Sequence, residues 1–317
     1  MDISRDLFNF VFLLFSVSNI IFYVPLVWLF NLLRVCFKPV YPKELVGKVI
    51  LITGASSGIG KHLAIEYAKE GACLALIARR EKQLQMVAQN AKAMGSPDVI
   101  AITADVSKHL DCSRFVEETI KHFGKLDYLV NNAAIATYGF FEDQTTVPDH
   151  DPVMDINFWG SIYTTYFALP HLKRNQGKII VICSCGGWFG TPGVSMYNAS
   201  KTALVSFFET LRMELDSEVD ITIVTPGMVD SNLTNDKWIE EENVKWAPMI
   251  SVEKFVKTIV DSTKYEDKYV IEPSWMKSIL LWKIFCPEIF NWLMKFLLVT
   301  RPEISSKKKR SPELNPF

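Results

Sequence analysis

The chain contains 317 residues, a length that suits one large α/β domain with appended segments. Its 34 Lys and Arg residues are balanced by 35 Asp and Glu residues, and the net charge of −1 lacks the basic bias typical of nucleic-acid-binding proteins. Nucleic acid is therefore not expected as a partner. Hydrophobic residues make up 49% of the chain and its mean hydropathy is positive, at +0.14, which together are high for a soluble enzyme and suggest an apolar segment outside the core.

An uncharged segment extends from Leu7 to Leu33. As a helix it would be about 40 Å long, which exceeds the roughly 30 Å of a hydrocarbon core. Pro25 interrupts the segment, so a straight span and a hairpin-like insertion both remain open. We predict a hydrophobic lipid anchor over residues 1–40.

The residues that flank this anchor indicate whether it is cleaved or retained, and how it is oriented. Acidic and basic residues are mixed before it, and no small-residue cleavage site stands out, so a retained anchor is favoured over a cleaved signal peptide. Only Arg5 is basic before the apolar segment, whereas four basic residues follow it: Arg34, Lys38, Lys43 and Lys48. The positive-inside rule then predicts that the rest of the chain faces the cytosol.

A glycine-rich turn follows the first strand-like run, residues 48–53. The turn contains three glycines before a helical pattern: Gly54, Gly58 and Gly60. Glycines let the backbone turn tightly, and the amides of a helix N-terminus can bind a pyrophosphate. A phosphate-binding P-loop is excluded, because Ile59 and His62 stand where it requires glycine and Ser or Thr. The pattern therefore predicts a dinucleotide site.

The second strand-like run, residues 73–78, ends in Arg79 and Arg80. Units that bind NAD usually carry an acidic residue at this place to hold the ribose hydroxyls. A basic residue there suits the additional phosphate of NADP(H). The sequence therefore favours NADP(H) as the cofactor.

Three side chains further along the chain suggest acid–base chemistry. Ser184 closes the apolar run 178–184, and Tyr197 and Lys201 lie four residues apart in a helix-like segment. Residues at this spacing share one helix face, so the Lys201 ammonium can lower the pKa of the Tyr197 phenol. Tyr197 could then act as an acid or base near neutral pH.

The last part of the chain is rich in aromatic and basic residues. Residues 228–250 lack periodicity and are predicted to form a lid over the substrate. Within 273–317, apolar residues recur at helical spacing, so this amphipathic segment either rests on lipid or covers the core or a dimer partner. A basic tail, residues 307–310, follows.

The six cysteines do not indicate disulfides, because Cys73 and Cys183 lie on strands that are predicted to be buried. Cys183 and Cys185 lack the spacing of a metal-ligand pair and are expected to pack around Ser184, so no metal site is predicted.

Strand-like and helix-like runs alternate along the chain, which predicts a Rossmann-type, doubly wound parallel sheet of the α/β class behind the anchor. The predicted strands lie near residues 48–53, 73–78, 99–104, 126–131, 178–184, 221–225 and 268–271. Ligands bind at the carboxyl ends of such strands. Thr53, Arg79, Asp105, Asn131, Ser184 and Pro226 all lie at these ends.

These residues together give a family resemblance. From about residue 47 to 272, the chain resembles the short-chain dehydrogenases/reductases in six motifs: Thr53-Gly-x-x-x-Gly-Ile-Gly60, Asn131-Asn-Ala-Ala134, Asn157, Ser184, Tyr197-x-x-x-Lys201 and Pro226-Gly227. It is most similar to plant steroleosins, the 11β-hydroxysteroid dehydrogenase-like proteins of oil bodies. The stretches that support this are Asn157-Phe-Trp-Gly-Ser, Tyr197-Asn-Ala-Ser-Lys, Ser206-Phe-Phe-Glu-Thr and Glu272-Pro-Ser-Trp.

The resemblance implies a role for each motif. Tyr197 would be the general acid or base, Ser184 would orient the carbonyl or alcohol, Lys201 would bind the nicotinamide ribose and lower the Tyr197 pKa, and Asn157 would hold a water of the proton relay. Asp105 would contact adenine. The implied cofactor-binding set is Gly54, Ser56, Ser57, Gly58, Ile59, Gly60, Arg79, Arg80, Asp105, Asn132, Ala133, Tyr197, Lys201, Pro226 and Gly227.

The sequence thus predicts a catalytic domain over 41–272, between the anchor and the C-terminal segment. Its expected activity is the NADP(H)-dependent interconversion of a secondary alcohol and a ketone on a hydrophobic, sterol-like substrate. The expected location is an oil body or the endoplasmic-reticulum membrane. Reduction of a sphingoid or fatty-acyl ketone and a structural lipid-droplet coat are the alternatives, and a homodimer remains open.

Overall fold

The computed structural model describes residues 43–143, 151–230, 249–265, 267–298 and 314–315, together with scattered helical residues between 7 and 29. The chain forms two compact units, Met1–Lys43 and Glu44–Phe317. No helix within the described residues has the length and apolar character needed to cross a membrane. Most of the predicted anchor, 1–40, and of the predicted lid, 228–250, lies outside the described residues.

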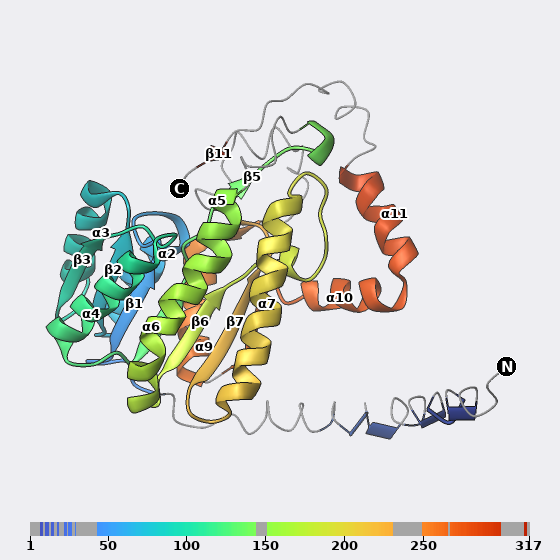
Figure 1. Ribbon diagram of the computed structural model, residues 1–317, viewed down its shortest axis with the longest axis horizontal. Helices are drawn as coiled ribbons and strands as arrows, with labels where there is room; N and C mark the ends of the chain where they lie inside the picture. The colour runs from blue at the N-terminus through green and yellow to red at the C-terminus, as the bar shows by residue number, and fades with distance from the viewer. Residues whose placement is uncertain are drawn as a thin grey trace. The chain divides into compact units, whose positions relative to one another are not determined.

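A parallel sheet of seven strands forms the centre of the second unit, in the spatial order β10-β7-β6-β4-β1-β2-β3 (Figure 1). It confirms the predicted Rossmann-like fold. The strands are β1 Val49–Thr53, β2 Cys73–Ala78, β3 Val99–Thr103, β4 Tyr128–Asn131, β6 Lys178–Ile182, β7 Asp220–Pro226 and β10 Tyr269–Glu272. The chain reverses its direction of travel through the sheet between β1 and β4, which places a ligand site at their carboxyl ends.

Helices cover both faces of this sheet. On one face lie α2 Gly58–Lys69, α3 Glu81–Ala93 and α9 Val252–Tyr265, whose apolar side chains form one core cluster. On the other face lie α4 His109–Phe123, α6 Gly160–Arg174 and α7 Ser195–Leu215, which form a second cluster. Alternate residues of β1 supply the two clusters, because successive strand side chains point to opposite faces.

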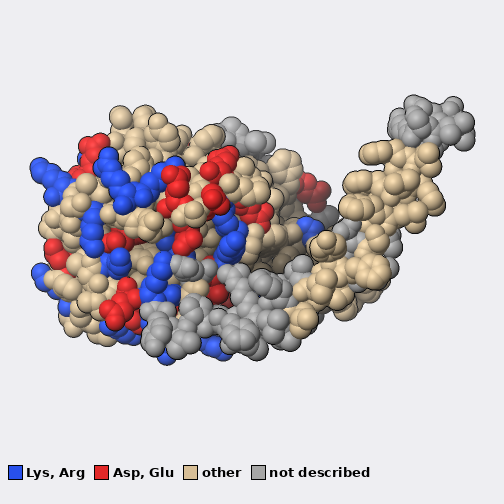
Figure 2. All heavy atoms as spheres, turned by 90° about the horizontal axis from the view of Figure 1, so that it is seen from below, with Lys and Arg blue, Asp and Glu red and all other residues tan. Residues whose placement is uncertain are grey.

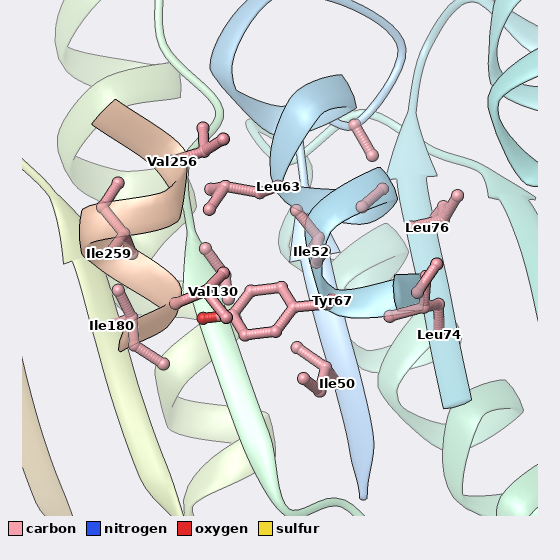
Figure 3. Close-up of a cluster of buried hydrophobic side chains, with 14 of the residues drawn as sticks. Ile50, Ile52, Leu63, Tyr67, Leu74, Leu76, Val130, Ile180, Val256 and Ile259 are labelled. Carbon is pink, nitrogen blue, oxygen red and sulfur yellow. The ribbon is translucent and has the colours of Figure 1, made fainter. Parts of the chain in front are cut away.

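Tyr67 of α2 is the largest side chain of the first cluster and has no exposed surface. Figure 3 shows its ring among Ile50, Leu74 and Val130. Its hydroxyl lies 3.0 Å from the hydroxyl of Thr263 in α9. This hydrogen bond satisfies the phenol in a surrounding that is otherwise apolar.

Shorter elements complete the second unit. A π-helical turn, Asp155–Trp159, joins α5, Asp151–Met154, to α6. The 3-10 turns are η1 Phe141–Asp143 and η4 Cys185–Gly187, and two-residue strands pair as β5 Ala136–Thr137 with β11 Leu314–Asn315 and as β8 Val229–Asp230 with β9 Ile250–Ser251. Figure 2 shows acidic and basic side chains interspersed over one face of the protein, without a large field of either sign.

Two helices follow β10: α10 Met276–Phe285 and α11 Pro287–Leu298. They lie at the edge of the unit, beyond α7 (Figure 1). Met276 of α10 and Phe290 of α11 are buried and form a small apolar cluster with Phe189, which follows β6. Most other side chains of the pair are exposed.

Candidate active site

The turn between β1 and α2 has the backbone that its glycines predict. Gly54 and Gly58 adopt φ values of +67° and +51°, which side chains other than glycine's rarely allow. A Cβ atom on Gly60 would lie 2.4 Å from the Gly54 carbonyl oxygen and 2.6 Å from Asn132 Nδ2. Gly60 therefore allows α2 to pack closely on the turn. Ser57 caps α2 without a side-chain hydrogen bond to it.

Thr53, the last residue of β1, holds β4 beside the turn. Its hydroxyl accepts hydrogen bonds from the backbone N–H groups of Asn132 and Ala133, at 3.0 and 3.1 Å, and donates to the Val130 carbonyl. The Asn132 amide donates in turn to the Thr53 carbonyl at 2.8 Å. The sequence motif includes Thr53, but this clamping role is evident only from the geometry.

The two arginines after β2 differ in their contacts. Arg80 is half-buried and its guanidinium donates to the hydroxyls of Ser56 and Ser57, at 3.0 and 2.5 Å. Arg79 is exposed and also lines the cavity, and no hydrogen bond links it to another described residue. Both arginines place positive charge beside the glycine turn.

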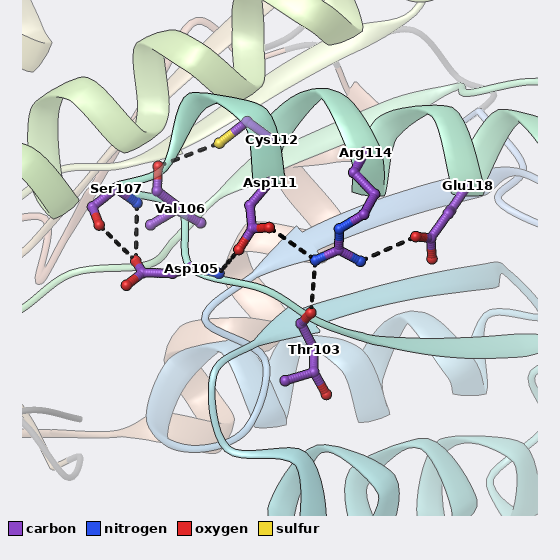
Figure 4. Close-up of polar contacts among 8 residues, drawn as sticks. All are labelled: Thr103, Asp105, Val106, Ser107, Asp111, Cys112, Arg114 and Glu118. Atoms are coloured by element: carbon purple, nitrogen blue, oxygen red, sulfur yellow. Dashed lines mark hydrogen bonds and ion pairs between the residues drawn. The ribbon is translucent and has the colours of Figure 1, made fainter.

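Asp105 lies just after β3 in a hydrogen-bonded turn, which Figure 4 shows. Its Oδ1 accepts from the backbone N–H and the hydroxyl of Ser107, while its own N–H donates to Asp111 at 2.8 Å. That bond is the main cause of a lowered Asp111 pKa, and Arg114 adds to it. The network fixes Asp105 at the cavity wall and leaves its Oδ2 without a hydrogen bond to the described residues.

A cavity of about 740 Å³ extends over the carboxyl ends of the strands. This volume lies within the range of small-molecule sites. The predicted site residues that line it are Gly54, Ser56, Ser57, Gly58, Ile59, Arg79, Arg80, Asp105, Asn132, Ala133, Ser184, Tyr197, Lys201, Pro226 and Gly227. Gly60 and Asn157 do not line it, and both lie behind the wall.

Ser184, Tyr197 and Lys201 converge on this cavity. Ser184 lies two residues past β6, and its hydroxyl accepts a hydrogen bond from the Gly186 N–H at 3.1 Å. Tyr197 and Lys201 lie on the first turns of α7, with the Lys201 ammonium 5.7 Å from the centre of the Tyr197 ring. Lys201 is 2% exposed and donates to the Ile182 carbonyl at 2.9 Å.

The acid–base properties of Tyr197 and Lys201 differ from the sequence prediction. Burial of the phenol raises the pKa of Tyr197, and a hydrogen bond with Ser184 opposes this only in part. Burial also lowers the pKa of Lys201 to about 8. The expected lowering of the Tyr197 pKa by Lys201 is therefore not present in this arrangement, because desolvation dominates and the ammonium is directed to Ile182.

Asn157 is fully buried in the π-helical turn. Its amide oxygen accepts from the Ile135 N–H at 2.8 Å, and its amide nitrogen donates to the Ile135 carbonyl and to the Ser200 hydroxyl, at 2.9 and 3.0 Å. The side chain thus joins the segment after β4 to α7. The proposed water-holding role is separate from these contacts and stays a prediction.

The loop after Ser184 packs tightly against α7. A Cβ on Gly186 would lie 2.2 Å from Asn198 Oδ1, and a Cβ on Gly187 would lie 2.9 Å from the Lys201 carbonyl oxygen. Trp188 donates from Nε1 to the Thr225 hydroxyl at 2.9 Å. Sequence reasoning missed Asn198 and Trp188, because their roles depend on contacts between segments that no spacing rule relates.

Pro226, the last residue of β7, and Gly227 are part of the cavity wall. The Gly227 N–H donates to the Glu272 carbonyl at 2.8 Å, which joins the end of β7 to the end of β10. A Cβ on Gly227 would lie 2.6 Å from the Met276 sulfur. Glycine at this position therefore allows α10 to approach the cavity.

These residues fit a nicotinamide dinucleotide. The amino end of α2, which has no side-chain cap, suits a pyrophosphate. Asp105, Tyr197 and Lys201 line the same cavity as the glycine turn.

Comparison with known proteins gives the family. A family model described as short chain dehydrogenase matches residues 48–242. The chain belongs to the short-chain dehydrogenases. It is 45% identical to 11-beta-hydroxysteroid dehydrogenase 1A of Arabidopsis thaliana, over 95% of this chain and 89% of that protein. It is 41% identical to 11-beta-hydroxysteroid dehydrogenase A of Sesamum indicum, over 95% and 90%.

Solved structures share the fold. A short-chain dehydrogenase/reductase from Burkholderia phymatum in complex with NAD superimposes with a TM-score of 0.71 at 23% identity, covering 78% of this chain and 96% of that one. An alcohol dehydrogenase from Thermococcus sibiricus complexed with 5-hydroxy-NADP gives a TM-score of 0.64 at 25% identity, covering 71% and 95%. The protein is thus an oxidoreductase that uses a nicotinamide cofactor.

Proposed function

We propose that this protein is an NADP(H)-dependent oxidoreductase that interconverts a secondary alcohol and a ketone on a hydrophobic, sterol-like substrate. The observation that carries the proposal is the convergence of Ser184, Tyr197 and Lys201 on one cavity with the glycine turn. The nicotinamide supplies or accepts the hydride when it is bound. The protein side chains bind the cofactor, orient the substrate and protonate its ketone oxygen.

Tyr197 acts as the general acid in the reductive direction. Burial raises its pKa and keeps the phenol protonated near neutral pH, which is the form that can donate a proton to a ketone oxygen. Ser184 donates its hydroxyl proton in a hydrogen bond to the same oxygen, while Gly186 holds the Ser184 oxygen in place. Lys201 supplies positive charge beside the phenolate that proton transfer leaves.

The preference for NADP(H) rests on the two arginines after β2. The Arg80 guanidinium donates hydrogen bonds to the serines of the glycine turn, and Arg79 lines the same cavity. A guanidinium binds a phosphate by charge-assisted hydrogen bonds, and no carboxylate stands at the strand end to favour ribose hydroxyls. We assign Arg79 to the 2′-phosphate and Arg80 to the support of the turn.

The sterol-like substrate is supported by the lining of the cavity beyond Ser184 and Tyr197. That part consists mainly of apolar and aromatic side chains: Phe189, Val194, Trp275, Met276, Ile279, Trp282, Phe290 and Leu293. Such a wall suits a large apolar substrate with one polar group to be held at the catalytic end. The names of the Arabidopsis and sesame relatives agree with this substrate class.

A panel of ketones tests the substrate. Purified protein and NADPH are incubated with steroid ketones, with a 3-ketosphingoid base and with long-chain fatty-acyl ketones, and products are identified by mass spectrometry. We expect turnover of the steroid ketones. Turnover of only the sphingoid or fatty-acyl ketones would change the substrate assignment from a sterol-like ketone to one of these lipid ketones. Tight NADPH binding with no turnover of any ketone would favour the structural lipid-droplet coat.

We further propose that residues 1–40 anchor the protein to an oil body or the endoplasmic-reticulum membrane, with the catalytic unit in the cytosol. The uncharged run Leu7–Leu33 and the basic residues after it support this location. Deletion of residues 1–38 is expected to move most of the protein from the lipid fraction to the supernatant without loss of activity on a dispersed substrate. Unchanged recovery in the lipid fraction would refute the proposed anchor.

A further inference from the structure

Helices α10 and α11 present a broad apolar surface away from the core. Their exposed large side chains are Trp275, just before α10, and Leu281, Trp282, Ile284, Phe285, Ile289, Trp292 and Phe296. The Trp292 and Phe296 rings stack on each other, with centroids 5.5 Å apart. We call this surface, from Trp275 to Phe296, the apolar face. Apolar clusters of this size on a protein surface mark interaction sites.

The opposite side of the same helix pair already has a partner. Phe290 packs edge-to-face on Phe189, with ring centroids 5.7 Å apart, and Met276 is buried beside them. Lys283 donates to the Trp188 carbonyl at 2.6 Å. The pair is therefore held on the loop after Ser184 by its inner side. The apolar face is what remains exposed after this packing.

The apolar face and the substrate cavity meet at two tryptophans. Trp275 and Trp282 line the cavity, yet they are 48% and 59% exposed. Tryptophan has an apolar body and one polar N–H, which suits a boundary between water and hydrocarbon. The two rings therefore belong both to the cavity lining and to the apolar face.

The charges around this face favour a lipid surface as the occupant. Of the charged residues between 275 and 298, Lys283 is engaged by the Trp188 carbonyl on the inner side, and Lys277, Glu288 and Lys295 are exposed, a set with net charge +1 in a chain with net charge −1. Basic residues beside apolar and tryptophan side chains match anionic lipid headgroups above acyl chains.

We infer that the apolar face of α10 and α11 docks on a lipid surface, so that substrate passes between that surface and the cavity beside Trp275 and Trp282. The inference rests on the proposed lipid location and deepens it. Residues 1–40 tether the chain, and the apolar face orients the cavity mouth toward the lipid. A second copy of the chain is the competing occupant.

Cys286 provides a native position for a probe, because it is exposed at the junction of α10 and α11. The full-length Cys36→Ser protein is labelled with bimane and reconstituted into phosphatidylcholine and phosphatidylserine vesicles. The same protein with Cys286→Ser gives the background signal. Fluorescence is then quenched either by brominated acyl chains or by aqueous iodide.

We expect quenching by the brominated lipid and protection from iodide. Quenching by iodide alone would overturn the inference, because the face would then be in water. Protection from both quenchers, with excimer emission when Cys286 carries pyrene, would assign the face to a dimer and also overturn it. These readings do not depend on turnover, so a failed ketone assay cannot be mistaken for a failure of docking.

A charge-introducing variant tests the face itself. Phe285 and Trp292 are 75% and 64% exposed and do not line the cavity, so Phe285→Glu/Trp292→Glu is expected to fold but to lose quenching by the brominated lipid. Leu110→Glu/Met213→Glu is the matched control, at apolar side chains of α4 and α7 that are 72% and 76% exposed, and should retain it. Loss of folding in detergent by the first variant alone would show that the face is core. Retained quenching by the brominated lipid would show that the apolar face does not drive docking, and this would overturn the inference.

Discussion

Lys201→Met is expected to abolish catalysis and to change how stability depends on pH. The stability of the variant relative to wild type is expected to be greater at neutral pH than at alkaline pH. The wild-type ammonium is 2% exposed, and burial lowers its pKa from 10.5 to about 8. Because the folded-state pKa lies below the unfolded value, the unfolded chain binds more protons between these pH values. Lys201 therefore costs stability below about pH 8, and the cost disappears as the pH rises toward 10.5.

The size of this effect follows from the pKa difference. At about 1.4 kcal/mol for each pKa unit, the cost is about 3 kcal/mol at pH 7 and under about 1 kcal/mol at pH 10. Methionine keeps the length of the side chain but leaves the Ile182 carbonyl without its partner, which costs about 1–3 kcal/mol at either pH. The change with pH is therefore more informative than the absolute difference between the two proteins.

Urea unfolding of wild type and Lys201→Met at pH 7, 8, 9 and 10 measures the difference directly. We expect the wild type to gain about 2 kcal/mol relative to the variant between pH 7 and 10. Lys82→Met, on an exposed position of α3, controls for the loss of a lysine at a solvated site. A constant difference between wild type and Lys201→Met across this range would show that Lys201 is not desolvated, and the proposed electrostatics of the site would be wrong.

Three further substitutions address the chemistry, the cofactor and the packing of the site. Tyr197→Phe should lower kcat by a factor of about 10²–10⁴ with little change in cofactor affinity, because only the proton donor is lost; near-normal kcat would exclude Tyr197 as the acid. Arg79→Asp should weaken the binding of NADPH by about 10–100-fold and leave the binding of NADH unchanged. If the ratio of the two affinities in fluorescence titrations does not change, another residue contacts the 2′-phosphate. Gly60→Ala should cost about 1–3 kcal/mol by overpacking, whereas Gly190→Ala, which has nothing within 4 Å of its Cβ, should not lower the melting temperature by as much.

The sheet was predictable because its strands are apolar runs that end in polar or glycine residues. Each of the seven predicted strands is present, with bounds that shift by at most a few residues. The site residues were predictable for the same reason: Thr53 ends a strand, Asp105 and Ser184 lie just past strand ends, and the carboxyl ends of parallel strands meet at one edge of a sheet.

Other properties of the site depend on packing and could not be predicted. Arg79 and Arg80 have the same chemistry and adjacent positions, and only the location of the Ser56 and Ser57 hydroxyls distinguishes them. The raised pKa of Tyr197 results from desolvation, which a spacing of four residues does not reveal. The helical stripe after residue 273 predicted α10 and α11, but it could not indicate that one side would pack on Phe189 while the other stays exposed.

Transfer of deuterium from labelled NADPH tests the proposed function most directly. Purified full-length protein is incubated with a steroid ketone and NADPH that carries deuterium at both C4 positions of the nicotinamide, and the alcohol product is analysed by mass spectrometry and NMR. We predict one deuterium at the new carbinol carbon with wild type, and a strongly reduced rate of the same product with Tyr197→Phe. A product without deuterium at that carbon, or equal rates for the two proteins, would contradict hydride transfer with Tyr197 as the acid.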